Sequence, residues 1–218
     1  MAILNKKQIL ERINNSNIEF DPVLDAFKIQ PNSVDLRLGW SFYIPKIWKY
    51  EARGRVALVA DYLNLQDVPE NFQIIKLKPG QYFEILPNEF VIISTLERIS
   101  LNADDLTAVL YGRSSALRRG LSIGSGTVAP HYKGCLTIPL TNNSGHIIRL
   151  YPGERLCQLE FNLLSLPLTG EEASKHGLQD AKYTDSTPYG LEARSDSQEE
   201  IEFIKAGQVD QLKDKFKI

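Results

Sequence analysis

The sequence predicts a mainly antiparallel β fold with a few short helices, and three observations support this prediction. Short apolar stretches with strand-like alternation recur along the chain, and Gly, Pro or Asn residues separate them at regular intervals. Neither a GxGxxG nor a Walker sequence is present, so the common parallel α/β nucleotide-binding folds are not indicated. The 218 residues suit one domain with a substantial core, with two small domains as the alternative. The pattern therefore favours a β-barrel or a β-sandwich.

The first predicted element is an amphipathic helix over residues 5–14. Ile9, Leu10 and Ile13 share one face, Asn5 suits the N-cap position, and a run of polar residues stops the helix. This pattern is typical of a helix that packs against a core without chemistry of its own.

Strands are predicted through the middle of the chain. In residues 34–39 apolar and polar residues alternate, so Asp35 and Arg37 point the same way, either as a solvated ion pair or as part of a site. Residues 74–94 indicate three strands with turns at Pro79-Gly80 and Pro87-Asn88. Further strands are predicted over residues 135–142, 146–151 and 155–164, after a flexible turn over residues 124–127.

Pro139 lies within one of these predicted strands. Because proline has no N–H to donate to a ladder, we expect that strand to lie at a sheet edge or to be bulged at this residue.

The C-terminal part of the chain differs in pattern. Residues 168–194 lose periodicity, which indicates either a lid or a disordered polar tail. Residues 198–218 predict an added amphipathic helix, interrupted at Gly207, with apolar positions at Ile201, Ile204, Val209, Leu212 and Phe216. We therefore expect a β domain with its lid over residues 1–195 and an added helix over 196–218.

Composition narrows the class of protein. The net charge of −2 provides no global basic field for nucleic acid, and no apolar run approaches the roughly 18 residues of a membrane span. The N-terminal residues lack the pattern of a signal peptide. Cys135 and Cys157 are expected to be buried free thiols, and the histidines at 131, 146 and 176 lack the spacing of zinc ligands. We expect a cytoplasmic protein without zinc.

The main candidate for chemistry is the stretch Gly112-Arg113-Ser114-Ser115, followed by Arg118 and Arg119. An apolar run stops at a glycine, and a cation and two hydroxyls follow at once. At the start of a short helix, such residues can bind a phosphate through backbone N–H groups, hydroxyls and guanidinium groups. An exposed basic helix start is the alternative.

Five stretches together resemble the family that joins dCTP deaminases to dUTP diphosphatases. Their order and spacing match the family over most of the chain, to about Ser195. The stretches are Gln30 to Gly39, Thr95 to Ile99, Gly112 to Ser115, Pro130 to Gly134, and Pro152 to Leu159.

The resemblance implies a distorted jelly-roll-like antiparallel β-barrel of the dUTP diphosphatase type, assembled as a homotrimer with three sites between subunits. It implies a hydrolase of nucleotide metabolism that binds a pyrimidine deoxynucleoside triphosphate with Mg²⁺ and without zinc, and an Asp35 that helps to hold the site. The implied ligand-binding residues are Arg113, Ser114, Ser115, Arg118, Tyr132, Gln158 and Lys182, of which Ser114 and Arg118 assist catalysis. Tyr132 would stack on the sugar, unless it is a turn aromatic that caps the core. Gln158 could also be a strand-face amide.

The sequence departs from the resembled enzymes at both catalytic carboxylates. The glutamate of the deaminases falls on Pro139, and the aspartate of the diphosphatases falls on Ala129. Neither residue can take or give a proton. His131 and Glu160 are the nearby groups that could substitute, and Ser186 stands where the deaminases often carry glutamine.

Three functions remain open from the sequence. The first is a dCTP deaminase-like protein that binds a pyrimidine deoxynucleoside triphosphate and, if it is active, deaminates dCTP to dUTP or acts on a related nucleotide. The second is a catalytically inactive trimer that senses a deoxynucleotide or has a structural role. The third is a protein-interaction role of residues 198–218.

Overall fold

The computed structural model describes residues 2–59, 71–169, 171–172, 175–176, 179–180 and 197–217. The chain divides into two compact units. The first consists of Met1–Pro45 and Gln73–Gly190, and the second of Lys46–Phe72 and Leu191–Ile218.

One large sheet dominates the first unit, and the predicted mainly β fold is confirmed. Ten of the described strands belong to this sheet. Its main path runs through β10 (Leu121–Ile123), β12 (Lys133–Asn142), β8 (Phe90–Leu101), β3 (Val34–Pro45), β14 (Arg155–Leu163), β9 (Leu106–Gly112) and β11 (Gly126–Val128), and each pair along it is antiparallel. Three more strands pair with members of the path: β1 (Ala2–Ile3) with β14, β2 (Ile18–Asp21) with β8, and β6 (Phe72–Lys76) with β3.

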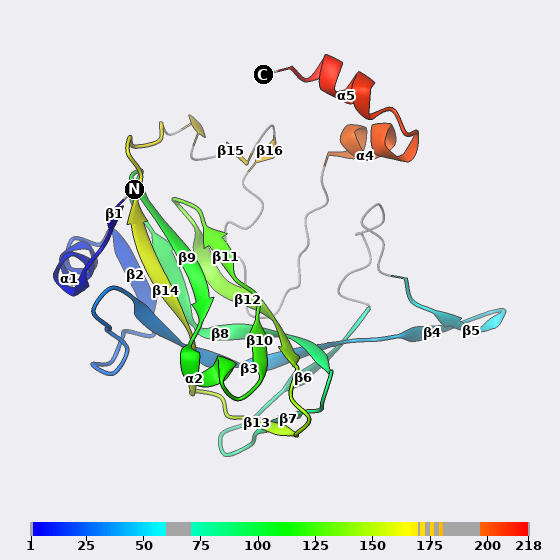
Figure 1. Ribbon diagram of the computed structural model, residues 1–218, viewed down its shortest axis with the longest axis horizontal. Coiled ribbons are helices and arrows are strands. Elements are labelled where there is room, and N and C mark those ends of the chain that lie inside the picture. Colours follow the sequence, from blue (N-terminus) through cyan, green and yellow to red (C-terminus); the bar gives the residue numbers. More distant parts are fainter. Residues whose placement is uncertain are drawn as a thin grey trace. The chain divides into compact units, whose positions relative to one another are not determined.

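The sheet curls, and Figure 1 shows β9 and β14 rising steeply from the level of β3 and β8. The pairing register shifts between Leu38 and Phe42 on β3, between Cys135 and Thr137 on β12, and between Arg155 and Cys157 on β14. Such irregularities bend a strand and increase its twist. The long strands can therefore change direction and enclose a core.

The core of the first unit lies on one face of this curled sheet. Alternate residues of neighbouring strands are fully buried, among them Val34, Leu36, Ala108, Leu159 and Phe161. A small sheet of β7 (Phe83–Ile85) and β13 (Ile148–Leu150) adds to this core. Phe83 of β7 stacks on Phe42 of β3 at 4.3 Å between ring centroids.

The predicted N-terminal helix is present as α1 (Lys6–Asn14). Asn5 caps it, and Asn5 and Gln8 form a reciprocal capping box. Ile9 is fully buried and Ile13 is partly buried against the core. The expectation that Leu10 lies on the same face was wrong, because Leu10 is 39% exposed. Adjacent helical residues differ by about 100° in direction, so Leu10 turns away from Ile9.

Pro139 corrects the expectation about its strand. β12 is not an edge strand, because β10 and β8 flank it, and its irregularity lies between Cys135 and Thr137. Pro139 lies one residue beyond the β10 ladder, where its carbonyl accepts the Gly124 N–H at 2.8 Å. The N and O atoms of one strand residue point to the same side. The N atom of Pro139 therefore points toward the end of the β10 ladder, where the absence of an N–H removes no ladder hydrogen bond.

Two other segments differ from their predicted form. The expected turn over residues 124–127 is shorter, because Gly126 and Thr127 belong to β11 and pair with β9. The expected single C-terminal helix consists of α4 (Gln198–Lys205) and α5 (Val209–Lys215), separated at Gly207 with φ 68°. Ile201 is buried, whereas Val209 is 44% exposed.

The remaining described elements are short. The second unit also contains a hairpin of β4 (Trp48–Glu51) and β5 (Gly54–Ala57). Within the expected lid, β15 (Lys175–His176) pairs with β16 (Gln179–Asp180), and most other residues of the lid lie outside the described part.

Cys135 and Cys157 are buried free thiols, as expected. Burial raises the pKa of both. None of the helices in the described part of the chain has the length and apolar character needed to cross a membrane.

Candidate functional site

The candidate anion site lies where β9 ends and α2 (Ser114–Leu117) begins. Arg113 is the N-cap residue, and its N–H donates to the Leu156 carbonyl of β14 at 3.0 Å. The turn is tight at Gly112, because a Cβ atom there would lie 3.2 Å from the Ile123 Cβ. Glycine therefore allows the helix to begin directly against β10.

Three of the predicted ligand-binding side chains are open at this turn. Ser114, Ser115 and Arg118 are exposed, and their side chains make no hydrogen bond or ion pair with another described residue. The following cation, Arg119, is paired instead with Glu154 at 3.3 Å. Two hydroxyls and an unengaged guanidinium are donors that suit phosphate oxygens.

A buried carboxylate holds Arg113, the fourth predicted ligand-binding residue of this turn. The Arg113 Nε lies 3.0 Å from Asp35 Oδ2. The same oxygen accepts hydrogen bonds from Arg155 Nη1 at 3.1 Å and from Gln30 Nε2 at 3.2 Å. The Asp35 side chain is 1% exposed, and that of Arg113 is 25% exposed. Arg113 thus spans from this carboxylate to the surface, where part of its guanidinium remains accessible.

The charge on Asp35 is set by two opposing effects. Burial raises its pKa above the ordinary value, while the charges of Arg113 and Arg155 act in the lowering direction, and the net direction is up. The second carboxylate oxygen, Oδ1, is buried without a hydrogen-bond partner in the described part of the chain.

These residues do not suit a protein-bound magnesium ion. Asp35 is already shared by two guanidinium groups. The described ranges also contain no group of three or more His, Cys, Asp or Glu side chains placed to hold a metal. The Mg²⁺ implied by the resemblance is therefore expected on the phosphate oxygens of the ligand, and no step is assigned to it.

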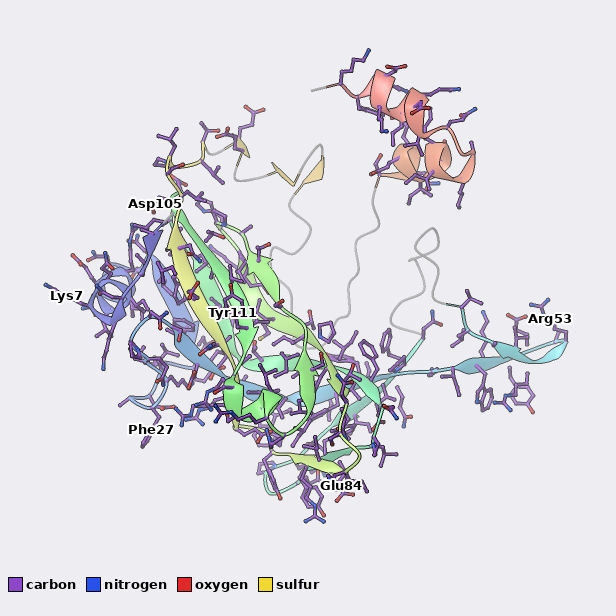
Figure 2. The ribbon with its side chains drawn as sticks, in the orientation of Figure 1. Lys7, Phe27, Arg53, Glu84, Asp105 and Tyr111 are labelled. Atoms are coloured by element: carbon purple, nitrogen blue, oxygen red, sulfur yellow. The ribbon has the colours of Figure 1, made fainter. Side chains whose placement is uncertain are left out.

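Gln158 lies in the same row of the sheet as Asp35. The register places Gln158 of β14 opposite Asp35 of β3 on one side and opposite Tyr111 of β9 on the other. Directly opposite residues share a face, so these three side chains lie on the sheet face away from the core. Gln158 Oε1 accepts from Ser33 Oγ at 3.4 Å. Tyr111 is 42% exposed on β9 (Figure 2).

A second charged network supports this row from the loop before β3. Lys28 is 2% exposed, and its Nζ binds Glu97 Oε1 of β8, a side chain that is fully buried. Glu97 Oε2 accepts the Arg37 N–H at 2.9 Å, and the Arg37 guanidinium binds Asp25 at 2.8 Å. Arg37 and Asp35 therefore do not form the solvated ion pair that the alternation left open.

The loop before β3, which this network holds through Lys28 and Asp25, also contacts residues of the candidate site. The Phe27 carbonyl accepts from Arg155 Nη1 at 2.6 Å and from Gln30 Nε2 at 2.9 Å. The pair of Lys28 and Glu97 was not predicted, because a lysine in a loop and a glutamate in an apolar strand are not recognisable from sequence as a buried pair.

The family stretch Pro130 to Gly134 lies elsewhere in the fold. Val128 pairs with Ala108, so the turn that follows, from Ala129, lies about 14 Å along β9 from Gly112, at roughly 3.4 Å per residue. Figure 2 shows Asp105, just before β9, and Tyr111 at different heights along this strand. One chain does not bring this turn to the Arg113 turn.

Tyr132 contacts the core from this distant turn. Its ring is partly buried against the core, and its hydroxyl donates to the Cys135 carbonyl at 2.9 Å. These contacts support the capping role, while the stacking role stays a prediction.

The four positions considered for proton transfer are all placed. Ala129 and Pro139 are exposed, and the Pro139 ring packs beside Gly124, where a Cβ atom would lie 3.0 Å from its Cδ. Glu160 Oε2 lies 3.5 Å from Asn32 Nδ2. His131 Nε2 lies 2.6 Å from Asp104 Oδ1, an interaction that the sequence did not indicate. Lys182 and Ser186 lie outside the described residues.

Comparisons with known proteins identify the family. The family model described as dCTP deaminase-like matches residues 3–164. A protein named "dCTP deaminase, dUMP-forming" from Methanobrevibacter smithii is 36% identical over 187 residues, which cover 84% of this chain and 90% of that protein. One with the same name from Dictyoglomus turgidum is 38% identical over 168 residues, which cover 76% and 82%.

A solved structure supports the fold. The 2'-deoxycytidine 5'-triphosphate deaminase from Agrobacterium tumefaciens superposes with a TM-score of 0.57 at 20% identity. The match covers 74% of this chain and 48% of that one, so this chain spans about half of that protein's length. On the family match and the two relatives, the chain belongs to the dCTP deaminase-like family.

Proposed function

We propose that the chain binds a pyrimidine deoxynucleoside triphosphate, with dCTP as the first candidate, and that the triphosphate lies at the Arg113 turn. The observation that carries this proposal is the set of unengaged donors at Ser114, Ser115 and Arg118, directly after a strand end in a member of this family. Each charge-assisted hydrogen bond to a phosphate is worth about 1.5–3 kcal/mol. The acid Asp35 behind the turn keeps the Arg113 guanidinium in place before the ligand arrives.

The remaining ligand contacts follow from the family positions. Gln158 lies in the row beside Asp35, and we assign it to the nucleotide. Tyr132 and Lys182 complete the proposed set. Because the Tyr132 turn lies far from the Arg113 turn along β9, we propose that a second copy supplies it, in a homotrimer with sites between subunits. We expect the protein in the cytoplasm, with no nucleic acid as partner.

The proposed reaction is hydrolytic deamination of dCTP to dUTP. The relatives are named as dUMP-forming, so the reaction of those proteins also includes hydrolysis of the triphosphate. In this chain Pro139 and Ala129 stand where the resembled enzymes carry their catalytic carboxylates. Loss of a group that transfers protons typically removes about two to four orders of magnitude of rate. We therefore expect turnover far below that of the relatives.

The second candidate function is a catalytically inactive trimer that senses a deoxynucleotide. The replacement of both carboxylates, together with the retained phosphate donors, is the observation that favours it. The two functions differ in turnover and agree in binding.

One experiment tests the proposal. The full chain is incubated with Mg²⁺ and each dNTP, while nucleotide affinity, ammonia and pyrophosphate are measured. We expect dCTP to bind, and Arg118→Ala to weaken its affinity by about 10- to 100-fold, the loss of one charge-assisted contact. Lys217→Ala, which removes an exposed cation of the second unit, is the matched control and should bind as the parent does. Binding without product favours the sensor, and absence of dNTP binding refutes the proposal.

A further inference from the structure

His131 occupies an unusual backbone position. The Tyr132 N–H donates to the Ala129 carbonyl at 3.2 Å, which closes a four-residue turn with Pro130 and His131 at its centre. His131 has φ 62°, in the left-handed region. A turn with positive φ at its third residue normally carries glycine there, because a Cβ atom makes this conformation unfavourable. The chain therefore carries an imidazole side chain at a position whose backbone conformation favours glycine.

Asp104 fixes this imidazole. His131 Nε2 lies 2.6 Å from Asp104 Oδ1, which extends from the turn between β8 and β9. The carboxylate selects the tautomer in which Nε2 carries the proton and donates it to Asp104. The other ring nitrogen, Nδ1, then has a lone pair, and no other described residue occupies it. The His131 side chain is 39% exposed, so a ligand can reach it.

His131, which Asp104 orients, lies close in sequence to Ala129, one of the two positions where the resembled enzymes carry a catalytic carboxylate. His131 is two residues beyond Ala129 on the same turn, and it directly precedes Tyr132, which we assign to the nucleotide. Of the described groups that could replace a lost carboxylate, Glu160 on β14 is engaged by Asn32, whereas His131 is oriented by an acid and open at one nitrogen. An imidazole held in this way is a common general base.

We propose that His131, oriented by Asp104, transfers the proton in the deamination of dCTP by this chain. The proposal rests on the proposed function. The oxygen of water adds to C4 of cytosine, and one of its protons moves to His131 Nδ1. His131 returns that proton to N4 as the C4–N4 bond breaks, and ammonia leaves. The second water proton ends on N3 of the product, so that dCTP and water give dUTP and ammonia. His131 is a catalytic residue in this scheme, and Asp104 is a positioning residue.

The test compares the full chain with His131→Gly and Asp104→Asn. Glycine suits a positive φ, so His131→Gly removes the imidazole without backbone strain and should remain folded. We expect ammonia release from dCTP to fall about 100-fold in His131→Gly at unchanged dCTP affinity. Added free imidazole should restore part of the rate in His131→Gly alone, which a structural role would not produce. Asp104→Asn should lower kcat with little effect on KM. His146→Ala removes an exposed histidine of another turn and is the matched control, with unchanged activity.

Each other outcome is decisive. If His131→Gly releases ammonia as fast as the parent chain, or if imidazole restores nothing, His131 does not transfer the proton. If the parent chain binds dCTP and releases no ammonia, this inference fails while the proposed nucleotide binding stands. If dCTP does not bind, the proposed function fails, and the inference fails with it.

Discussion

Replacing Lys28 with methionine should strongly destabilise the first unit. Lys28 and Glu97 are 2% and 0% exposed, and each is the main counter-charge of the other. Asp25 lies 3.9 Å from the Lys28 Nζ and is itself engaged by Arg37, whose hydrogen bond lowers the pKa of Asp25. In Lys28→Met the Glu97 carboxylate stays buried, and the Arg37 N–H is the one donor still seen on it among the described residues.

The expected magnitude follows from this geometry. Removing one partner of a buried ion pair costs about 3–5 kcal/mol, because the other charge is left without compensation. The double variant Lys28→Met with Glu97→Gln should recover most of this loss, since a neutral amide is far less costly to bury than a carboxylate and can still accept from Arg37. The non-additivity between the two positions should then reach about 2–3 kcal/mol.

Urea unfolding at neutral pH measures these free energies. Protein concentration must be held fixed, because an assembly of subunits makes the unfolding midpoint depend on it. Lys49→Met breaks an exposed pair with Glu51 and is the control, with an unchanged midpoint expected. If Lys28→Met costs less than about 1 kcal/mol, the range of surface pairs, the assignment of Lys28 and Glu97 as a buried, mutually dependent pair is refuted.

Two further predictions concern the candidate site. Gly112→Ala would place a Cβ atom 2.9 Å from Leu117 Cδ2 and 3.2 Å from the Ile123 Cβ, so we expect urea unfolding to show a loss of about 1–3 kcal/mol, together with weaker dNTP binding. Gly126→Ala is the control and should be tolerated, because the space around its Cβ is open. Equal stability of the two variants would contradict this reasoning. For Asp35, burial raises the pKa above 3.8, so the stability that its neutral form contributes is complete below about pH 3.8 and is lost as the pH rises through the folded-state pKa. Asp35→Asn should therefore gain stability relative to the parent chain as the pH rises over this range, and a parent chain that gains on the variant would show that the two arginines outweigh burial.

The sequence was informative wherever the signal is local. Alternation and turn residues predicted the strands from β6 to β8, and the polar Asn5 marked the start of α1. The family stretches located the Arg113 turn, because a strand end, a cation and two hydroxyls are consecutive in the chain. Buried free thiols were also predictable, since both cysteines stand in apolar surroundings.

Local sequence signals predicted less well which face of a helix is buried and where the pairing of two strands stops. Leu10 belongs to an apolar pattern but is exposed, because it lies about 100° around the helix from the buried Ile9. Pro139 is tolerated inside a sheet because the β10 ladder stops at Leu140, the next residue, which depends on where a distant strand ends.

The sequence by itself determined the class of fold, the family and the place of the candidate phosphate donors, because these depend on residues that are neighbours in the chain. The tertiary structure alone decided which charges meet. Asp35 binds Arg113 and Arg155 rather than the nearby Arg37, Lys28 binds Glu97, and His131 binds Asp104. A long side chain has several possible partners, and only the sheet register and the loop geometry place one of them within hydrogen-bond distance.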